Sequence, residues 1–287
     1  MNGNLGVIIS TENLTGPALG TFAGRLEALG YESLWLPELF GREPVATAGF
    51  LLARTGRLKV ATGIANVYVR DATAMALTRQ TLAELSEGRF LLGLGVSNPG
   101  LNASRGHAWE PPLTKMRAYL DAMAAATVDA PAPAAPAPVY LAAHGPLLQS
   151  LGARRADGII TYLMPPEHTA AARARIGEGP GLSVVSPFLA EPDPGEARRK
   201  ARKALRYYVT LDYYHREWRK LGFDDTDFAN GGSDRLIDTL VAWGDEAALE
   251  ARVRAFRDAG ADRVIVMPFD AAGAQGRDAL SLLAPAR

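Results

Sequence analysis

The sequence contains no cysteine, which excludes disulfide bonds, thiolate nucleophiles and cysteine-ligated metal ions. It has only four histidines, and no two of them have the i, i+4 spacing of a metal-binding helix. The Gly-x-Ser-x-Gly pattern of the serine hydrolases is also missing. We therefore expect no metal site, and we expect neither a metal-dependent nor a serine hydrolase.

An excess of charge of either sign is absent as well, because 31 basic residues balance 31 acidic ones. Binding to the phosphates of a nucleic acid requires a clustered positive field, so we expect no nucleic-acid partner. No apolar run approaches the roughly 20 residues needed to cross a bilayer. The first residues, Met1 to Asn4, lack the basic and apolar parts of a signal peptide. We expect a cytoplasmic protein with no membrane partner.

What the sequence does contain is a regular alternation of short apolar runs with stretches of helical spacing. Strands are predicted for residues 5–10, 32–37, 58–67, 89–96, 139–143, 158–163, 182–189 and 262–268. Helices are predicted for residues 17–29, 44–54, 71–86, 113–126, 147–155, 194–221 and 246–259. Strands that are apolar on both faces indicate a parallel sheet covered by helices. Eight of them favour a closed (β/α)8 barrel, formed by residues 1–287 as a single domain.

In a barrel of this kind, the reactive residues lie at the carboxyl ends of the strands and in the loops that follow. This rule selects a short list of side chains and small residues: Glu38, Gly63, Ile64, Asn66, Tyr68, Ser97, Asn98, Ala143, His144 and Gly145. Each follows, or ends, one of the predicted strands 32–37, 58–67, 89–96 and 139–143.

Two glycines, Gly93 and Gly95, lie in the fourth predicted strand. They do not complete a dinucleotide-binding fingerprint, because the third glycine is absent and we expect no helix directly afterwards. Small residues at alternate positions instead allow a planar ligand to approach the strand.

His144, Gly145 and Pro146 form the turn between a predicted strand and a predicted helix. Backbone N–H groups at a helix start attract anions, and glycine permits the close approach of a phosphate. The turn is thus a candidate phosphate site; the alternative is an ordinary strand-to-helix turn.

The segment 57–100 reads RLKVATGIANVYVRDATAMALTRQTLAELSEGRFLLGLGVSNPG. Its TGI strand, its NVYVRD turn and the run LSEGRFLLGLG resemble the luciferase-like monooxygenase superfamily. The motifs RGH at 105–107 and PLTKM at 112–116 are similar to those of probable F420-dependent oxidoreductases of actinobacteria. The resemblance extends over nearly the whole chain.

This resemblance implies a TIM barrel that forms a homodimer and binds a flavin or the deazaflavin coenzyme F420. It also implies a non-prolyl cis peptide in the third strand, behind the cofactor ring, which maps to Gly63 and Ile64. The other matched positions divide into three groups. Glu38 corresponds to an acidic position after the second strand. Asn66, Ser97 and Asn98 correspond to residues along the ring and its polyol chain, and Ala143, His144, Gly145 and Pro146 to the loop near the phosphate.

Two positions depart from the family pattern. Relatives that oxidise alcohols or sugar phosphates carry a histidine directly after the acidic residue of the second strand, where this chain has Leu39. Some relatives carry a glutamate where this chain has Asn98. The usual acid–base pair is therefore missing, which argues against alcohol or sugar-phosphate dehydrogenation.

The resemblance thus predicts an oxidoreductase that transfers a hydride between F420 and a small organic substrate. The candidates for its proton donor, in falling order of preference, are Glu38, His107 and Tyr68. One alternative is an FMN-dependent monooxygenase, and another is a protein that binds the cofactor without turnover. A lysine-dependent lyase has less support, because none of the five lysines ends a predicted strand.

Overall fold

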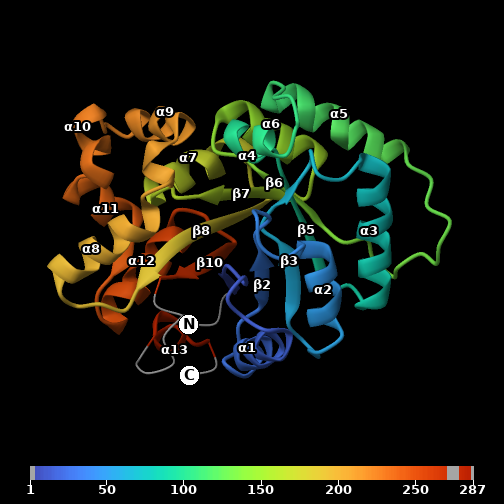
Figure 1. The fold of residues 1–287 in the computed structure, drawn as a ribbon, viewed down its shortest axis with the longest axis horizontal. Coiled ribbons are helices and arrows are strands. Elements are labelled where there is room, and N and C mark those ends of the chain that lie inside the picture. Colours follow the sequence, from blue (N-terminus) through green and yellow to red (C-terminus); the bar gives the residue numbers. More distant parts are fainter. Residues whose placement is uncertain (1–3, 270–277, 286–287) are drawn as a thin grey trace.

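The computed structural model describes residues 4–269 and 278–285 (Figure 1). Its strands are β1 (Leu5–Ile8), β2 (Ser33–Leu36), β3 (Lys59–Thr62), β4 (Ala65–Asn66), β5 (Phe90–Gly95), β6 (Val139–Ala142), β7 (Gly158–Tyr162), β8 (Gly181–Leu189), β9 (Ala242–Trp243) and β10 (Arg263–Pro268). Every pairing is parallel, and β10 pairs with both β1 and β8, which closes the sheet into a barrel. Because β3 and β4 share one position beside β5, and β9 only extends β8, the barrel has eight strand positions. The predicted (β/α)8 barrel is confirmed.

Helices follow most of the strands and cover the barrel. They are α1 (Gly16–Ala28), α2 (Pro44–Leu52), α3 (Ala72–Leu85), α4 (Pro99–Ser104), α5 (Pro112–Ala125), α6 (Pro146–Arg155), α7 (Pro166–Ile176), α8 (Pro194–Leu205), α9 (Asp212–Lys220), α10 (Asp225–Phe228), α11 (Asp234–Leu240), α12 (Glu246–Asp258) and α13 (Ala279–Leu282). Side-chain oxygens of Thr15, Asp71, Asp193 and Asp245 accept backbone N–H groups at the starts of α1, α3, α8 and α12. α6 packs between α5 and α7 in the ring of helices around the barrel, and Figure 1 shows α13 on the opposite side of the molecule from α6.

The side chains of each barrel strand alternate between two cores, as a period of two requires. One set fills the interior of the barrel and includes Ile8, Trp35, Leu91, Ile160 and Ile265. The other set faces the surrounding helices and forms the largest hydrophobic cluster.

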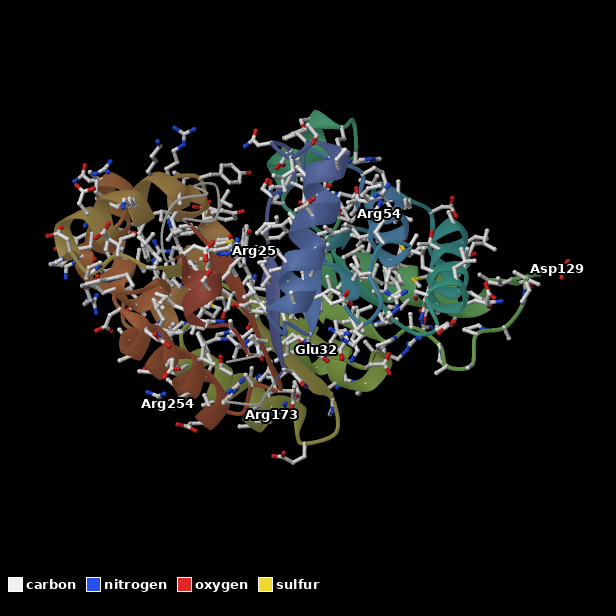
Figure 2. The ribbon with its side chains drawn as sticks, turned by 90° about the horizontal axis from the view of Figure 1, so that it is seen from below. Arg25, Glu32, Arg54, Asp129, Arg173 and Arg254 are labelled. Atoms are coloured by element: carbon white, nitrogen blue, oxygen red, sulfur yellow. The ribbon has the colours of Figure 1, made fainter. Side chains whose placement is uncertain are left out.

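A charged cluster fills the amino-terminal end of the barrel. Arg263 Nε lies 2.9 Å from Glu32 Oε2, and Lys59 Nζ lies 2.9 Å from Glu32 Oε1. Glu32 is labelled in Figure 2, just below α1. Burial by itself would raise the pKa of Glu32, but the two cations lower it on balance. This end is packed and paired, which leaves the carboxyl end of the strands as the place for a site.

The predicted continuous helix 194–221 is wrong. α8 ends at Leu205, a 3-10 turn covers Tyr208–Thr210, and α9 begins at Asp212. Leu211 is extended, with φ −96° and ψ 114°, and the Thr210 hydroxyl donates to the Tyr207 carbonyl at 2.7 Å. Threonine hydroxyls that bond to nearby backbone carbonyls compete with the helix, which is the physical reason for the break. Sequence patterning also missed α7, α10, α11, α13 and the short strand β9.

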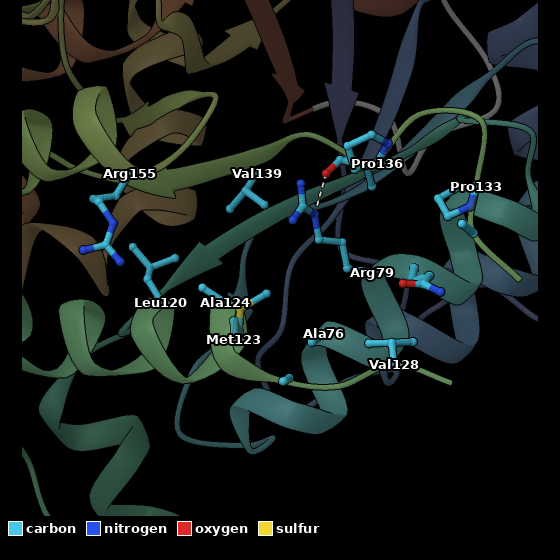
Figure 3. Close-up of a pocket in the computed structure, with 14 residues that line it drawn as sticks. Ala76, Arg79, Leu120, Met123, Ala124, Val128, Pro133, Pro136, Val139 and Arg155 are labelled. Atoms are coloured by element: carbon cyan, nitrogen blue, oxygen red, sulfur yellow. Dashed lines mark hydrogen bonds between the residues drawn. The ribbon is translucent and has the colours of Figure 1, made fainter. Parts of the chain in front are cut away.

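A cavity of about 520 Å³ lies outside the barrel, between α3, α5 and the Pro/Ala-rich connector that leads to β6. Figure 3 shows Arg79 bridging it, and Arg79 Nε donates to the carbonyl of Ala137 at 2.6 Å. Burial lowers the pKa of Arg79, although nearby Asp157 opposes the shift. None of the residues that line this cavity is among those that the sequence selected for the site.

Candidate functional site

The third strand of the barrel is interrupted at its carboxyl end. β3 stops at Thr62, β4 begins at Ala65, and the peptide bond between Gly63 and Ile64 is cis, as the resemblance implies. The predicted single strand 58–67 is therefore wrong in one respect, since the two residues between β3 and β4 leave the ladder. Gly63 and Ile64 are partly exposed, whereas Thr62 and Ala65 beside them are buried. The interruption thus presents a small surface at the mouth of the barrel.

Gly95 of β5 leaves room for this surface. A Cβ atom on Gly95 would lie 2.6 Å from Ile64 Cγ1 and 3.2 Å from the Cβ of Ala142. The glycine that did not fit a dinucleotide fingerprint therefore has a local role, because it accommodates the Ile64 side chain.

Glu38 follows β2 and is buried beside the interruption. Its two carboxylate oxygens each lie 2.9 Å from Arg70 Nη1, and its Oε2 also accepts the backbone N–H of Asn66 at 2.7 Å. Arg70 makes a second ion pair with Glu43. The carboxylate is thus neutralised by Arg70, and it fixes the backbone of β4.

Asn66 continues this network toward β5. Its Nδ2 donates to Asn102 Oδ1 at 2.7 Å, and Asn102 Nδ2 donates to the carbonyl of Val96 at 2.8 Å. Asn66 Oδ1 also accepts the backbone N–H of Tyr68 at 3.1 Å. Both amides are fully buried. Sequence reasoning missed Asn102, which locks the ends of β4 and β5 together.

A short helix, α4, starts directly after Asn98, so the expectation of no helix there is wrong. Asn98 Oδ1 accepts the backbone N–H of Leu101 at 2.9 Å, and Pro99 occupies the first helical position. The asparagine cap and the proline were the sequence signal for this helix. Tyr207 also donates to Asn98 Oδ1 at 3.3 Å, and Ser97 has a positive φ of 58°. The predicted pair Ser97 and Asn98 therefore forms the bend between β5 and α4.

Tyr68 and His107 lie side by side on neighbouring loops. Their ring centroids are 5.9 Å apart, and Tyr68 stacks on Trp109 at 5.9 Å with an interplanar angle of 13°. The Tyr68 hydroxyl accepts the backbone N–H of Glu110 at 2.9 Å. The structure thus brings together two of the three predicted proton donors, and Trp109 joins them.

Ala143, His144, Gly145 and Pro146 connect β6 to α6, with Gly145 at the cap position. His144 packs against Tyr213 and Tyr214 of α9, at centroid distances of 6.3 Å and 5.3 Å. This burial, together with the neighbouring charge of His168, lowers the pKa of His144 to about 3. The imidazole is therefore neutral near pH 7.

Glu217 of α9 lies beside the start of α6. The sequence did not indicate that this residue would be near the predicted phosphate turn. A Cβ atom on Gly145 would come within 3.3 Å of Glu217 Oε1, and Lys220 Nζ lies 2.7 Å from both carboxylate oxygens. The predicted phosphate turn is thus flanked by a paired carboxylate and ammonium.

Within residues 4–269 and 278–285, no group of three or more histidine, aspartate or glutamate side chains is arranged to hold a metal ion. In the same part of the chain, no helix is both long and apolar enough to span a membrane.

The family model described as luciferase-like monooxygenase matches residues 4–263. A 5,10-methylenetetrahydromethanopterin reductase of Methanolobus tindarius is 27% identical over 215 residues, which cover 66% of this chain and 66% of that relative.

Solved structures share the fold. The coenzyme F420 dependent tetrahydromethanopterin reductase from Methanopyrus kandleri superposes with a TM-score of 0.78 at 17% identity, over 99% of this chain and 98% of that one. An F420-dependent secondary alcohol dehydrogenase in complex with an F420-acetone adduct gives a TM-score of 0.73 at 17% identity, over 93% of each chain.

Proposed function

The chain belongs to the luciferase-like monooxygenase family, and from this premise we propose that it transfers a hydride between coenzyme F420 and a small organic substrate. The observation that carries the proposal is the partly exposed pair Gly63 and Ile64, set beside the buried network of Glu38, Asn66 and Arg70 at the barrel mouth. A flat ring requires a firm, solvent-accessible surface of this kind. The M. tindarius relative and the solved neighbours support the choice of an F420-type cofactor.

The residues of the site divide into three parts along the cofactor. Gly63 and Ile64 support the ring, and Asn66, Ser97 and Asn98 line its edge and its polyol chain. The backbone of Ala143, His144, Gly145 and Pro146 receives the phosphate, where the start of α6 favours an anion. Lys220, which now holds Glu217, supplies a cation close to that turn. When bound, F420 supplies two-electron hydride chemistry.

The protein has to hold the substrate, exclude water and move one proton. Glu38, His107 and Tyr68 are the candidate proton donors. Both oxygens of Glu38 already accept hydrogen bonds from Arg70 or Asn66, so its role is to hold β4 in place. We therefore place the proton donor in the neighbouring pair of His107 and Tyr68, which line the mouth together.

We also propose that residues 1–287 act as one domain, in a cytoplasmic homodimer. Leu77 and Leu85 of α3 are 42% and 70% exposed, and exposed apolar side chains on the outside of the barrel suit a contact between subunits.

Turnover separates this proposal from its rivals. Reduced F420 is mixed anaerobically with the protein and a panel of conjugated alkenes, imines and ketones, and the absorbance of the oxidised deazaflavin is followed. We expect at least one acceptor to reoxidise the cofactor. Oxygen uptake with reduced FMN, without any reoxidation of F420, would instead identify an FMN-dependent monooxygenase. A protein that binds F420 but reoxidises it with no acceptor would be a binder without turnover.

A further inference from the structure

Large apolar side chains are exposed around the mouth of the barrel. Phe40 is 74% exposed, Tyr207 is 49% exposed, and Leu39 and Trp109 are each 39% exposed. These residues belong to the segments that follow β2, β5 and β8, so they gather at the carboxyl end of the strands. Single exposed apolar residues need no explanation, but a group of them around one opening marks a binding surface.

Three of these side chains, those of Phe40, Trp109 and Tyr207, contact a residue near the proposed cofactor site. Arg105 donates to the Leu39 carbonyl, and its guanidinium carbon lies 5.8 Å from the centroid of the Phe40 ring. Trp109 stacks on Tyr68, and Tyr207 donates to Asn98. The exposed surface is thus continuous with the groups that surround Gly63 and Ile64.

Three carboxylates near this mouth are paired with cations, whereas Glu12, which lies against Gly41, accepts the Ser10 hydroxyl and makes no ion pair within the described residues. Glu38 and Glu43 pair with Arg70, and Glu110 pairs with Lys115 at 2.7 Å. Arg105 makes no ion pair within the described residues, but its guanidinium faces an aromatic ring, and this planar cation stacks readily on π systems. The position directly after Glu38 holds a leucine. A charged or sugar-like substrate would find few groups here to replace its hydration, whereas a flat apolar one would find rings to stack on.

We propose that the substrate is an uncharged, flat, conjugated organic molecule, which the aromatic rim of Phe40, Trp109 and Tyr207 holds over the cofactor site. This assignment rests on the proposed function for its chemistry, because the rim is where a substrate would meet the cofactor. The recognition itself does not require a bound cofactor, and this allows a separate test.

Equilibrium dialysis of the cofactor-free protein against chalcone and 4-carboxychalcone provides that test. The two compounds have the same planar skeleton and differ by one negative charge. Since the protein has no cysteine, neither compound can be trapped by addition to a thiol. We expect chalcone to bind at least about tenfold more tightly than its carboxylate. The variants F40A and W109A should each weaken chalcone binding by about tenfold, and R254A, which shortens an exposed side chain of α12, should leave it unchanged.

Three results would overturn the inference. The carboxylate could bind as tightly as chalcone, which would make Arg105 an anion-binding residue. F40A and W109A could bind chalcone like the wild type while their circular dichroism shows native folding. F40A could dissociate a dimer in size-exclusion chromatography, which would place the rim in a subunit interface. A failure to bind F420 would refute the proposed function without changing the dialysis result, so the two failures can be told apart.

Discussion

The neutral imidazole of His144 makes the stability of the protein depend on pH in a way that one substitution should remove. In the unfolded chain this histidine has its ordinary pKa of about 6.5, whereas burial against Tyr213 and Tyr214 lowers the folded value to about 3. Below pH 6.5 the unfolded state therefore binds a proton that the folded state does not bind. The contribution of His144 to stability is complete above about pH 6.5 and is lost as the pH falls toward about 3.

The magnitude follows from the two pKa values. At about pH 5 the unfolded histidine is almost fully protonated and the folded one is almost fully neutral, which lowers the free energy of unfolding by about 2 kcal/mol relative to neutral pH. This figure depends chiefly on the unfolded pKa, because any folded value well below about 4 gives nearly the same result at that pH. The pKa of His168 is also lowered by burial, so His168 adds a loss of its own that all the variants share.

The variant H144F keeps an aromatic ring against Tyr213 and Tyr214 but has no titrating group. Urea unfolding of the wild type and of H144F would be measured at about pH 7.5 and about pH 5. We expect the drop in unfolding free energy between these pH values to be about 2 kcal/mol smaller in H144F than in the wild type. L147N alters an exposed residue of α6, the helix that follows the His144 turn, and should keep the wild-type drop. Equal drops in H144F and the wild type would show that the imidazole is protonated in the folded protein, and the reasoning would fail.

Two further predictions concern the frame of the site. In G93A the new Cβ would lie 2.1 Å from the Thr62 carbonyl oxygen, so we expect a loss of about 3 kcal/mol in urea unfolding. G24A, which meets no atom within 4 Å on α1, should gain about 0.5–1 kcal/mol, and equal effects of the two changes would contradict this packing. N102L leaves the Asn66 amide without its buried acceptor, and it should cost about 2 kcal/mol and weaken F420 binding. Wild-type stability and affinity in N102L would show that the amide network does not shape the site.

The repeated alternation of apolar runs and helical spacing was enough to predict the barrel, because parallel strands buried on both faces leave a strong pattern. Asp71 illustrates the local side of this success, since its carboxylate caps α3 as an aspartate before a helical run should. The rule that barrels carry their sites at the carboxyl ends of the strands then selected Glu38, Gly63 and Asn66, which lie close together in the structure.

The errors arose where tertiary contacts or short elements determine the outcome. The segment 194–221 has continuous helical spacing, but Tyr214 and Trp218 are buried in a cluster of their own, and the chain turns at Leu211 to reach it. α4 has only six residues, too few for a period to emerge, so Asn102 could not be placed on it. The pairing of Glu38 with Arg70 and the position of Glu217 beside Gly145 join distant parts of the chain. No local pattern records such contacts.

The central claim is that the surface at Gly63 and Ile64 receives a deazaflavin. A fluorescence titration of the wild-type protein with F420, alongside the same titration with FMN, tests it most directly. The account predicts saturable binding of F420 that is at least about tenfold tighter than the binding of FMN. Tighter binding of FMN would contradict the assignment of the cofactor, and binding of neither would contradict the assignment of the site.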